Sequence, residues 1–175
     1  MDTTVVADTT TVAPDGNGFF AEFGSPILND AGQVAFEGCL TGTAGGDSDT
    51  SGIFLGDGSA LTQVVRTGQA APDANGSFSS VDFPALNDAG QAAFTASLTG
   101  TAGGGSGDSG VFLGDGSTLT RIARAGQVAA DANGSFSYFT SPALNDAGHV
   151  AFLGRLTGTA GGNGAFSGIF LGDGS

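Results

Sequence analysis

The chain has 175 residues, enough for one domain with a sizeable apolar core, and it carries 17 acidic residues against four basic ones, all arginine. A formal net charge of −13 repels phosphate backbones and anionic lipid, so binding to nucleic acid or to a membrane surface is disfavoured. There is no apolar run of membrane-spanning length and no basic-then-apolar leader, and the single cysteine, Cys39, excludes an intrachain disulfide.

The chain consists of three copies of one unit, joined without gaps. The tetrapeptide Asn-Asp-Ala-Gly begins at positions 29, 87 and 145, and the hexapeptide Phe-Leu-Gly-Asp-Gly-Ser begins at positions 54, 112 and 170. Both recur after 58 residues, which makes internal repetition the first organising feature of the fold. The copies cover residues 2–59, 60–117 and 118–175, and together they form a single repeat domain over 1–175.

Each copy contains four predicted strands. In the second copy these are Leu61–Arg66, Ser79–Leu86, Gln91–Leu98 and Ser109–Leu113. The Asn-Asp-Ala-Gly turn joins the second strand to the third, and a Gly-Asp-Gly-Ser-Thr turn joins the fourth to the first strand of the next copy. The strands should therefore follow one another in antiparallel order. The longer link, Gly68–Ser77, should carry the chain from one four-stranded unit to the next.

The predicted strands are apolar or small on both faces. Gln91–Phe94 and Gly110–Leu113 do not alternate polar and apolar residues, as a strand with one solvated face would. Sheets stacked face to face bury both faces, so an all-β fold of three four-stranded antiparallel propeller blades is favoured, with Ser79–Leu86 and its equivalents as the inner strands. A β-trefoil also needs three repeats and remains the alternative.

A recurring segment resembles a known family. Asn29–Phe36, with the corresponding segments at 87–94 and 145–152, is similar to the NxxGxxAF tandem-repeat family of bacterial extracellular proteins, and the Gly-Gln…Ala-Pro-Asp stretch at 68–73 fits that pattern too. The resemblance implies a secreted or cell-surface protein with a propeller-like arrangement. It supplies no catalytic residues. This chain departs from the pattern at His149, which replaces Gln, and at Thr10-Thr11, which replace Gly-Gln.

The residue types needed for catalysis are scarce. His149 is the only histidine, and its counterparts in the other copies are glutamines. A nucleophile–base pair would have to combine it with Cys39, which lies at a non-equivalent strand position. We therefore expect no enzyme activity and no catalytic residues, and the same scarcity excludes a zinc site of the usual kind.

One loop has the start of a calcium-binding pattern. Asp47, Asp49 and Ser51 offer oxygen ligands at the first, third and fifth positions, and Gly52 follows. The corresponding loops of the other copies lack this set, and no glutamate occupies the twelfth position. An ordinary solvated loop is the favoured interpretation, and no cofactor is expected. The alternative is a Ca²⁺ site, which would lie at these three residues and be single rather than threefold.

The expected function is that of a non-catalytic extracellular scaffold or interaction module. The alternative is a ligand-binding module, for a glycan or a Ca²⁺-dependent protein partner, that uses loops at one end of the ring. Sugar sites usually stack the ligand on Trp or Tyr, whereas this chain has no Trp and a single tyrosine, Tyr138.

Three blades are too few for a closed propeller, which usually has about four to eight. Residues 3–7 correspond to Leu61–Val65, the strand that should follow a Gly-Asp-Gly-Ser turn. Residues 3–7 of one chain should then pair with Gly168–Leu171 of a second chain. This strand exchange predicts a homodimer that closes six blades and protects the free edges.

Overall fold

The computed structural model describes residues 3–102, 108–160 and 166–174. These residues form an all-β structure of three antiparallel sheets, in which the one helical element is a short 3₁₀ turn at Gly46–Ser48. Within this part of the chain, no helix is long and apolar enough to cross a bilayer.

The sheets follow one another along the chain. The first contains β1 (Phe19–Phe23), β2 (Ile27–Leu28), β3 (Val34–Thr41), β4 (Ser51–Gly56) and β5 (Leu61–Arg66). The second contains β6 (Ser77–Leu86), β7 (Ala92–Thr99), β8 (Ser109–Gly114) and β9 (Leu119–Arg124). The third contains β10 (Ser135–Phe139), β11 (Ala143–Leu144), β12 (Val150–Thr157) and β13 (Phe166–Gly172).

The strand order within each sheet is a meander, as the turns predict. The second sheet runs β6-β7-β8-β9, and the first runs β1-β3-β4-β5 with β2 paired to β3. In the third sheet β12 lies between β10 and β13, and no further strand pairs with β13 among the described residues. The first predicted strand of a copy completes the sheet of the preceding copy, because β5 pairs with β4 and β9 pairs with β8.

Turn chemistry explains the hairpins. Asn87 Oδ1 accepts a hydrogen bond from the backbone N–H of Gln91 (2.9 Å), and Gly90 adopts a φ of +75° that favours glycine. In the Gly-Asp-Gly-Ser hairpin between β4 and β5, Asp57 Oδ1 accepts hydrogen bonds from the N–H groups of Ser59 and Ala60. These bonds from Ala60 and Ser59 lower the pKa of Asp57 to about 2.

A proline interrupts the strand that starts each sheet. The predicted strand Ser79–Leu86 is continuous as β6, but its register on β7 shifts between Asp82 and Ala85, on either side of Pro84. In the first sheet the same strand is split into β1 and β2, with Pro26 in the gap. Proline has no N–H to donate to the ladder, so pairing breaks at this point.

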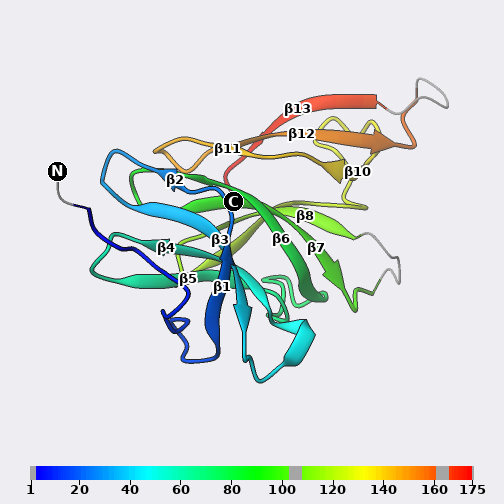
Figure 1. Ribbon diagram of the computed structural model, residues 1–175. Coiled ribbons are helices and arrows are strands. Elements are labelled where there is room, and N and C mark those ends of the chain that lie inside the picture. Colours follow the sequence, from blue (N-terminus) through cyan, green and yellow to red (C-terminus); the bar gives the residue numbers. More distant parts are fainter. Residues whose placement is uncertain (1–2, 103–107, 161–165, 175) are drawn as a thin grey trace.

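The sheets are stacked in series, with the second between the first and the third (Figure 1). One apolar cluster joins the Ile53 and Leu55 side of β4 to the Phe78, Phe94 and Phe112 side of the second sheet. A corresponding cluster joins the opposite side of the second sheet to the third sheet. The phenylalanine side of a sheet therefore faces the N-terminal end of the stack, and its aliphatic side faces the C-terminal end.

Neighbouring sheets decide which of these residues are buried. Leu55 and Leu113 are each 8% exposed, whereas Leu171, in an identical hexapeptide, is 71% exposed. Because the local sequence is the same, the difference comes from the sheet that covers the first two leucines and from the lack of such a cover, within the described chain, over β13.

Truncation of a core phenylalanine should be costly. Phe112 is fully buried and packs edge-on against Phe78, with ring centroids 5.0 Å apart. Phe112→Ala should lower the free energy of unfolding by about 3–5 kcal/mol, measured by urea denaturation. The matched control is Tyr138→Ala, an exposed aromatic whose ring lies 5.5 Å from the guanidinium of Arg155. It should cost less than about 1 kcal/mol, and equal losses would contradict the described packing.

Candidate functional site

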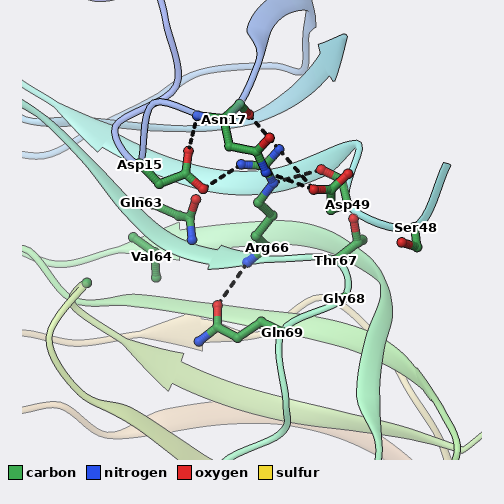
Figure 2. Close-up of a pocket in the computed structure, with 11 residues that line it drawn as sticks. Asp15, Asn17, Ser48, Asp49, Gln63, Val64, Arg66, Thr67, Gly68 and Gln69 are labelled. Carbon is green, nitrogen blue, oxygen red and sulfur yellow. Dashed lines mark hydrogen bonds and ion pairs between the residues drawn. The ribbon is translucent and has the colours of Figure 1, made fainter. Parts of the chain in front are cut away.

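A polar pocket of about 490 Å³ lies beside the first sheet, where the end of β5 meets the loop before β1 and the loop before β4 (Figure 2). Arg66, the last residue of β5, extends between Asp15 and Asp49. The buried charges of the described chain are Arg66, which lines this pocket, and Arg124, at the equivalent position of the second sheet.

Every nitrogen of the Arg66 guanidinium has a partner. Nε donates to the backbone oxygen of Asp49 (2.7 Å), Nη1 donates to Asp15 Oδ2 (2.7 Å), and Nη2 donates to the backbone oxygen of Asn17 (2.8 Å). Nη2 also lies 3.7 Å from Asp49 Oδ2. A guanidinium satisfied in this way offers no free fork to an anionic ligand, and it acts as a clamp between three chain segments.

Asn17 completes the clamp. Its backbone N–H donates to Asp15 Oδ1 (2.9 Å), which fixes the loop as an Asx turn. Its side-chain amide donates to Asp49 Oδ2 (2.9 Å) and accepts from the backbone N–H of Ala44 (2.7 Å). The loop before β1 is therefore fixed to the loop between β3 and β4.

The second sheet repeats the clamp. Arg124 Nη1 donates to Asp73 Oδ2 (2.7 Å), and Nη2 donates to the backbone oxygen of Asn75 (2.8 Å) and to Asp108 Oδ2 (3.1 Å). Asp108 takes the part of Asp49 although it lies one residue out of the repeat register. Arg121 adds a second ion pair to Asp73 at 3.1 Å.

Within the described chain, the third sheet has the hydrogen-bonded loop of the clamp without the arginine. Asn133 accepts from the backbone N–H of Ala160 (2.9 Å), and its own N–H donates to Asp131 Oδ1 (3.0 Å), as in the other two sheets. Asp131 is exposed, and among the described residues no arginine pairs with it.

Two of the clamp carboxylates, Asp49 and Asp73, have a pKa below the ordinary aspartate value. The side chain of Thr43 makes the largest contribution to lowering the pKa of Asp49, with further bonds from Asn17 and Gly45 and the charge of Arg66. For Asp73, desolvation acts to raise the pKa, but the N–H of Asn75, the bond and charge of Arg124 and the bond from Arg121 together outweigh it. Both carboxylates are thus held in the charged form that the arginines need.

The residues of the predicted calcium loop do not converge. Asp47 is exposed in the 3₁₀ turn, and Asp49 points toward Arg66 and Asn17. Ser51 begins β4, and its backbone exchanges hydrogen bonds with Thr67. The described ranges contain no group of three His, Cys, Asp or Glu side chains that could hold a metal. The Ca²⁺ site remains a prediction.

The other residues singled out by sequence, Cys39 and His149, do not line this pocket. Cys39 is half-buried on β3, where desolvation and then the charges of Glu37 and Glu22 raise the pKa of its thiol. His149 is exposed directly after the last Asn-Asp-Ala-Gly turn, with Nδ1 3.3 Å from the side-chain nitrogen of Asn145. They belong to different sheets, and the structure does not bring them together.

Sequence reasoning missed the two clamping arginines. A signal was present, because Arg66 and Arg124 are 58 residues apart in a chain with only four basic residues. Their partners Asp15 and Asp73 have the same spacing, but turn formation alone accounted for those aspartates.

A family model covers residues 2–175, almost the whole chain. The chain belongs to this family, DUF7453, which is described as a family of unknown function. No curated protein and no solved structure matches the chain. Membership of DUF7453 thus assigns no activity to the chain.

The clamp should make the second sheet sensitive to loss of one carboxylate. Asp73→Asn should lower the free energy of unfolding by about 1–3 kcal/mol at pH 7, because it leaves part of the buried Arg124 guanidinium without its acceptor. Asp131→Asn, at the equivalent exposed position without an arginine, is the control and should change stability by less than about 0.5 kcal/mol. Chemical denaturation provides the measurement.

The same variant tests the pH dependence. Since the pKa of Asp73 is lowered on folding, its contribution is complete above the ordinary aspartate pKa of about 4 and is lost as the pH falls through the lower folded value. Below about pH 4 the wild type should therefore lose more stability than Asp73→Asn. Parallel pH profiles of the two proteins would contradict the clamp.

Proposed function

We propose that this chain is a non-catalytic interaction module whose three sheets are consecutive blades of a β-propeller. The observation that carries the proposal is the serial stacking of antiparallel meanders, in which the second sheet buries apolar residues on both faces. Blades of a propeller need a neighbour on each side, so such a module is incomplete until a further surface covers its two ends.

Three features support a propeller over a trefoil. The strands form separate sheets, each sheet is a meander, and the long links pass from one sheet to the next. The resemblance of the repeated Asn-Asp-Ala-Gly segments to the NxxGxxAF family agrees with this arrangement. It also leads us to propose an extracellular or cell-surface location.

The N-terminal segment supports closure by a second chain. Val6 lies against Gly56 of the first sheet, and Val64 of β5 lies against Gly114, the equivalent glycine of the second sheet. Residues 3–7 therefore lie along the first sheet in the way that β5 lies along the second. Residues 3–7 belong to no strand, and β13 has a free edge in the described chain. We propose that this segment of one chain pairs with Gly168–Leu171 of its partner, so that two chains close six blades as a homodimer.

A glycine substitution can test this pairing. A Cβ on Gly52 would lie 2.6 Å from the backbone oxygen of Val65 on the neighbouring strand. At Gly168 the nearest atoms lie 3.2 Å away, on the ring of Phe170. Gly168→Ala should therefore leave the single chain folded but obstruct an incoming strand.

Light scattering should report roughly twice the chain mass of 16.9 kDa for the wild type. Overpacking of about 1–3 kcal/mol predicts that Gly168→Ala weakens association at least about tenfold. Gly52→Ala is the matched substitution where a strand is already present, and it should lower stability. A wild type that is monomeric at micromolar concentration would contradict closure by two chains, and unchanged association of Gly168→Ala would contradict pairing at β13.

The polar pocket favours a second candidate, a ligand-binding module for a glycan or a Ca²⁺-dependent protein partner. Asp49 Oδ1 and Gln63 Oε1 are buried there without a hydrogen-bond partner in the described chain. Sugar hydroxyl groups or a cation would satisfy such acceptors.

Calorimetric titration with CaCl₂ tests the cation. A site at Asp47, Asp49 and Ser51 predicts one Ca²⁺ per chain, with binding weakened in Asp47→Ala. Because Asp47 is exposed, this variant should fold like the wild type. Asp30→Ala, which removes an exposed carboxylate of the first Asn-Asp turn, is the control and should bind as the wild type does. No heat of binding, or binding unaffected by Asp47→Ala, would reject the predicted site.

A further inference from the structure

The two internal junctions between sheets use equivalent apolar positions. At the first, Ile53 and Leu55 share a cluster with Val81, and Leu86 packs against it. At the second, the corresponding cluster contains Val111, Leu113 and Phe139, and Leu144 packs against it. In both, aliphatic residues of the earlier sheet lie against the strand that starts the later sheet.

The same positions are exposed at the two ends of the stack. Ile169 and Leu171 on β13, which we name the tail face, are 75% and 71% exposed. Phe23 and Leu28 at the ends of β1 and β2, which we name the head face, are 42% and 70% exposed. The chain thus carries both halves of a third junction, one at each end.

Hydrogen bonds between the Asn-Asp turns give the junctions a direction. Asn29 Nδ2 donates to the backbone oxygen of Asn87 (2.8 Å), and the N–H of Asp30 donates to Asp88 Oδ1 (2.8 Å). The second junction repeats both bonds: Asn87 Nδ2 donates to Asn145 O (3.1 Å), and Asp88 N to Asp146 Oδ1 (3.0 Å). At each junction the earlier turn donates and the later turn accepts.

Each end of the stack carries one half of this bond pair. The N–H of Asp146 and one hydrogen of the Asn145 amide donate to no later turn within the described chain. In the first turn, the backbone oxygen of Asn29 and Oδ1 of Asp30 receive no bond from an earlier turn among the residues that the structure describes. The donors therefore lie at the same end as the tail face, and the acceptors lie at the same end as the head face.

We propose that a second copy of this chain docks head to tail. Its head face would cover Ile169 and Leu171, and its Asn29-Asp30 turn would accept the bonds that Asn145 and Asp146 offer. The apolar and polar contacts independently require the same polarity, which makes the interface heterologous. The inference rests on the proposed association of two chains and specifies which faces and which turns of the two chains meet.

Two charge variants test the polarity. Leu28→Glu blocks the head face, and Leu171→Glu blocks the tail face; both side chains are about 70% exposed, so each variant should fold as a single chain. Either variant alone should remain monomeric at concentrations where the wild type associates. An equimolar mixture should form 1:1 dimers, because the intact head of one variant meets the intact tail of the other.

Sedimentation velocity, with one variant fluorescently labelled, measures the mixture. The mixed dimer has one intact junction, so it should form at a higher concentration than the wild-type dimer, which has two. Thr99→Glu, at the exposed end of β7, is the control and should associate as the wild type does.

The outcomes separate this inference from the proposed function. If Leu171→Glu or Leu28→Glu associates on its own, or if their mixture stays monomeric while the wild type associates, head-to-tail docking is overturned and the interaction module stands. If the wild type does not associate at any concentration, both head-to-tail docking and the proposed closure by two chains are overturned. Circular dichroism of each variant at low concentration verifies the fold.

Discussion

The need to bury both faces of each sheet is the constraint on which this structure depends. After an initial serine, strands such as β4 and β8 are apolar or glycine to their ends, so neither face is suited to water. A single such sheet would expose a row of leucine, isoleucine and phenylalanine. Stacking buries a face of one sheet against the next sheet, but a linear stack always leaves one apolar face uncovered at each end.

The charged residues support this arrangement at the sheet ends. Two of the four arginines are buried, and each fixes the loop before the first strand to the end of the fourth strand of its own sheet. Breaking such buried pairs is costly, because the remaining partner keeps its charge without compensation. In so acidic a chain, the arginines thus fix loop geometry and leave the outer surface strongly negative.

Turn residues made much of the fold predictable. Leu61–Arg66 was predicted with the bounds of β5, and the Asn-Asp-Ala-Gly hairpin follows from side chains that bond to their own backbone. The split of β1 from β2 was not predicted, because it depends on where Pro26 falls relative to the hydrogen-bonded edge of its neighbour. That is a property of register, which local patterns leave open.

The candidate site was less predictable for a related reason. The spacing of Asp47, Asp49 and Ser51 suggested a metal loop, but spacing carries no information about a distant cation. Arg66 lies 17 residues beyond Asp49 and reaches it only because β5 folds back along β4. The competition between an arginine and a metal for one carboxylate is decided by tertiary structure.

Asp8 occupies the repeat position of Arg66 and Arg124, and its carboxylate instead accepts hydrogen bonds from Thr10 and Thr11. In a ring of two chains, the two internal junctions of each chain would be covalently continuous, with an arginine clamp at the end of the earlier sheet. The junctions between chains would instead bring Asp8 toward the exposed Asp131. Such a ring would therefore open at its two junctions between chains, under dilution or mechanical load, before any sheet unfolds.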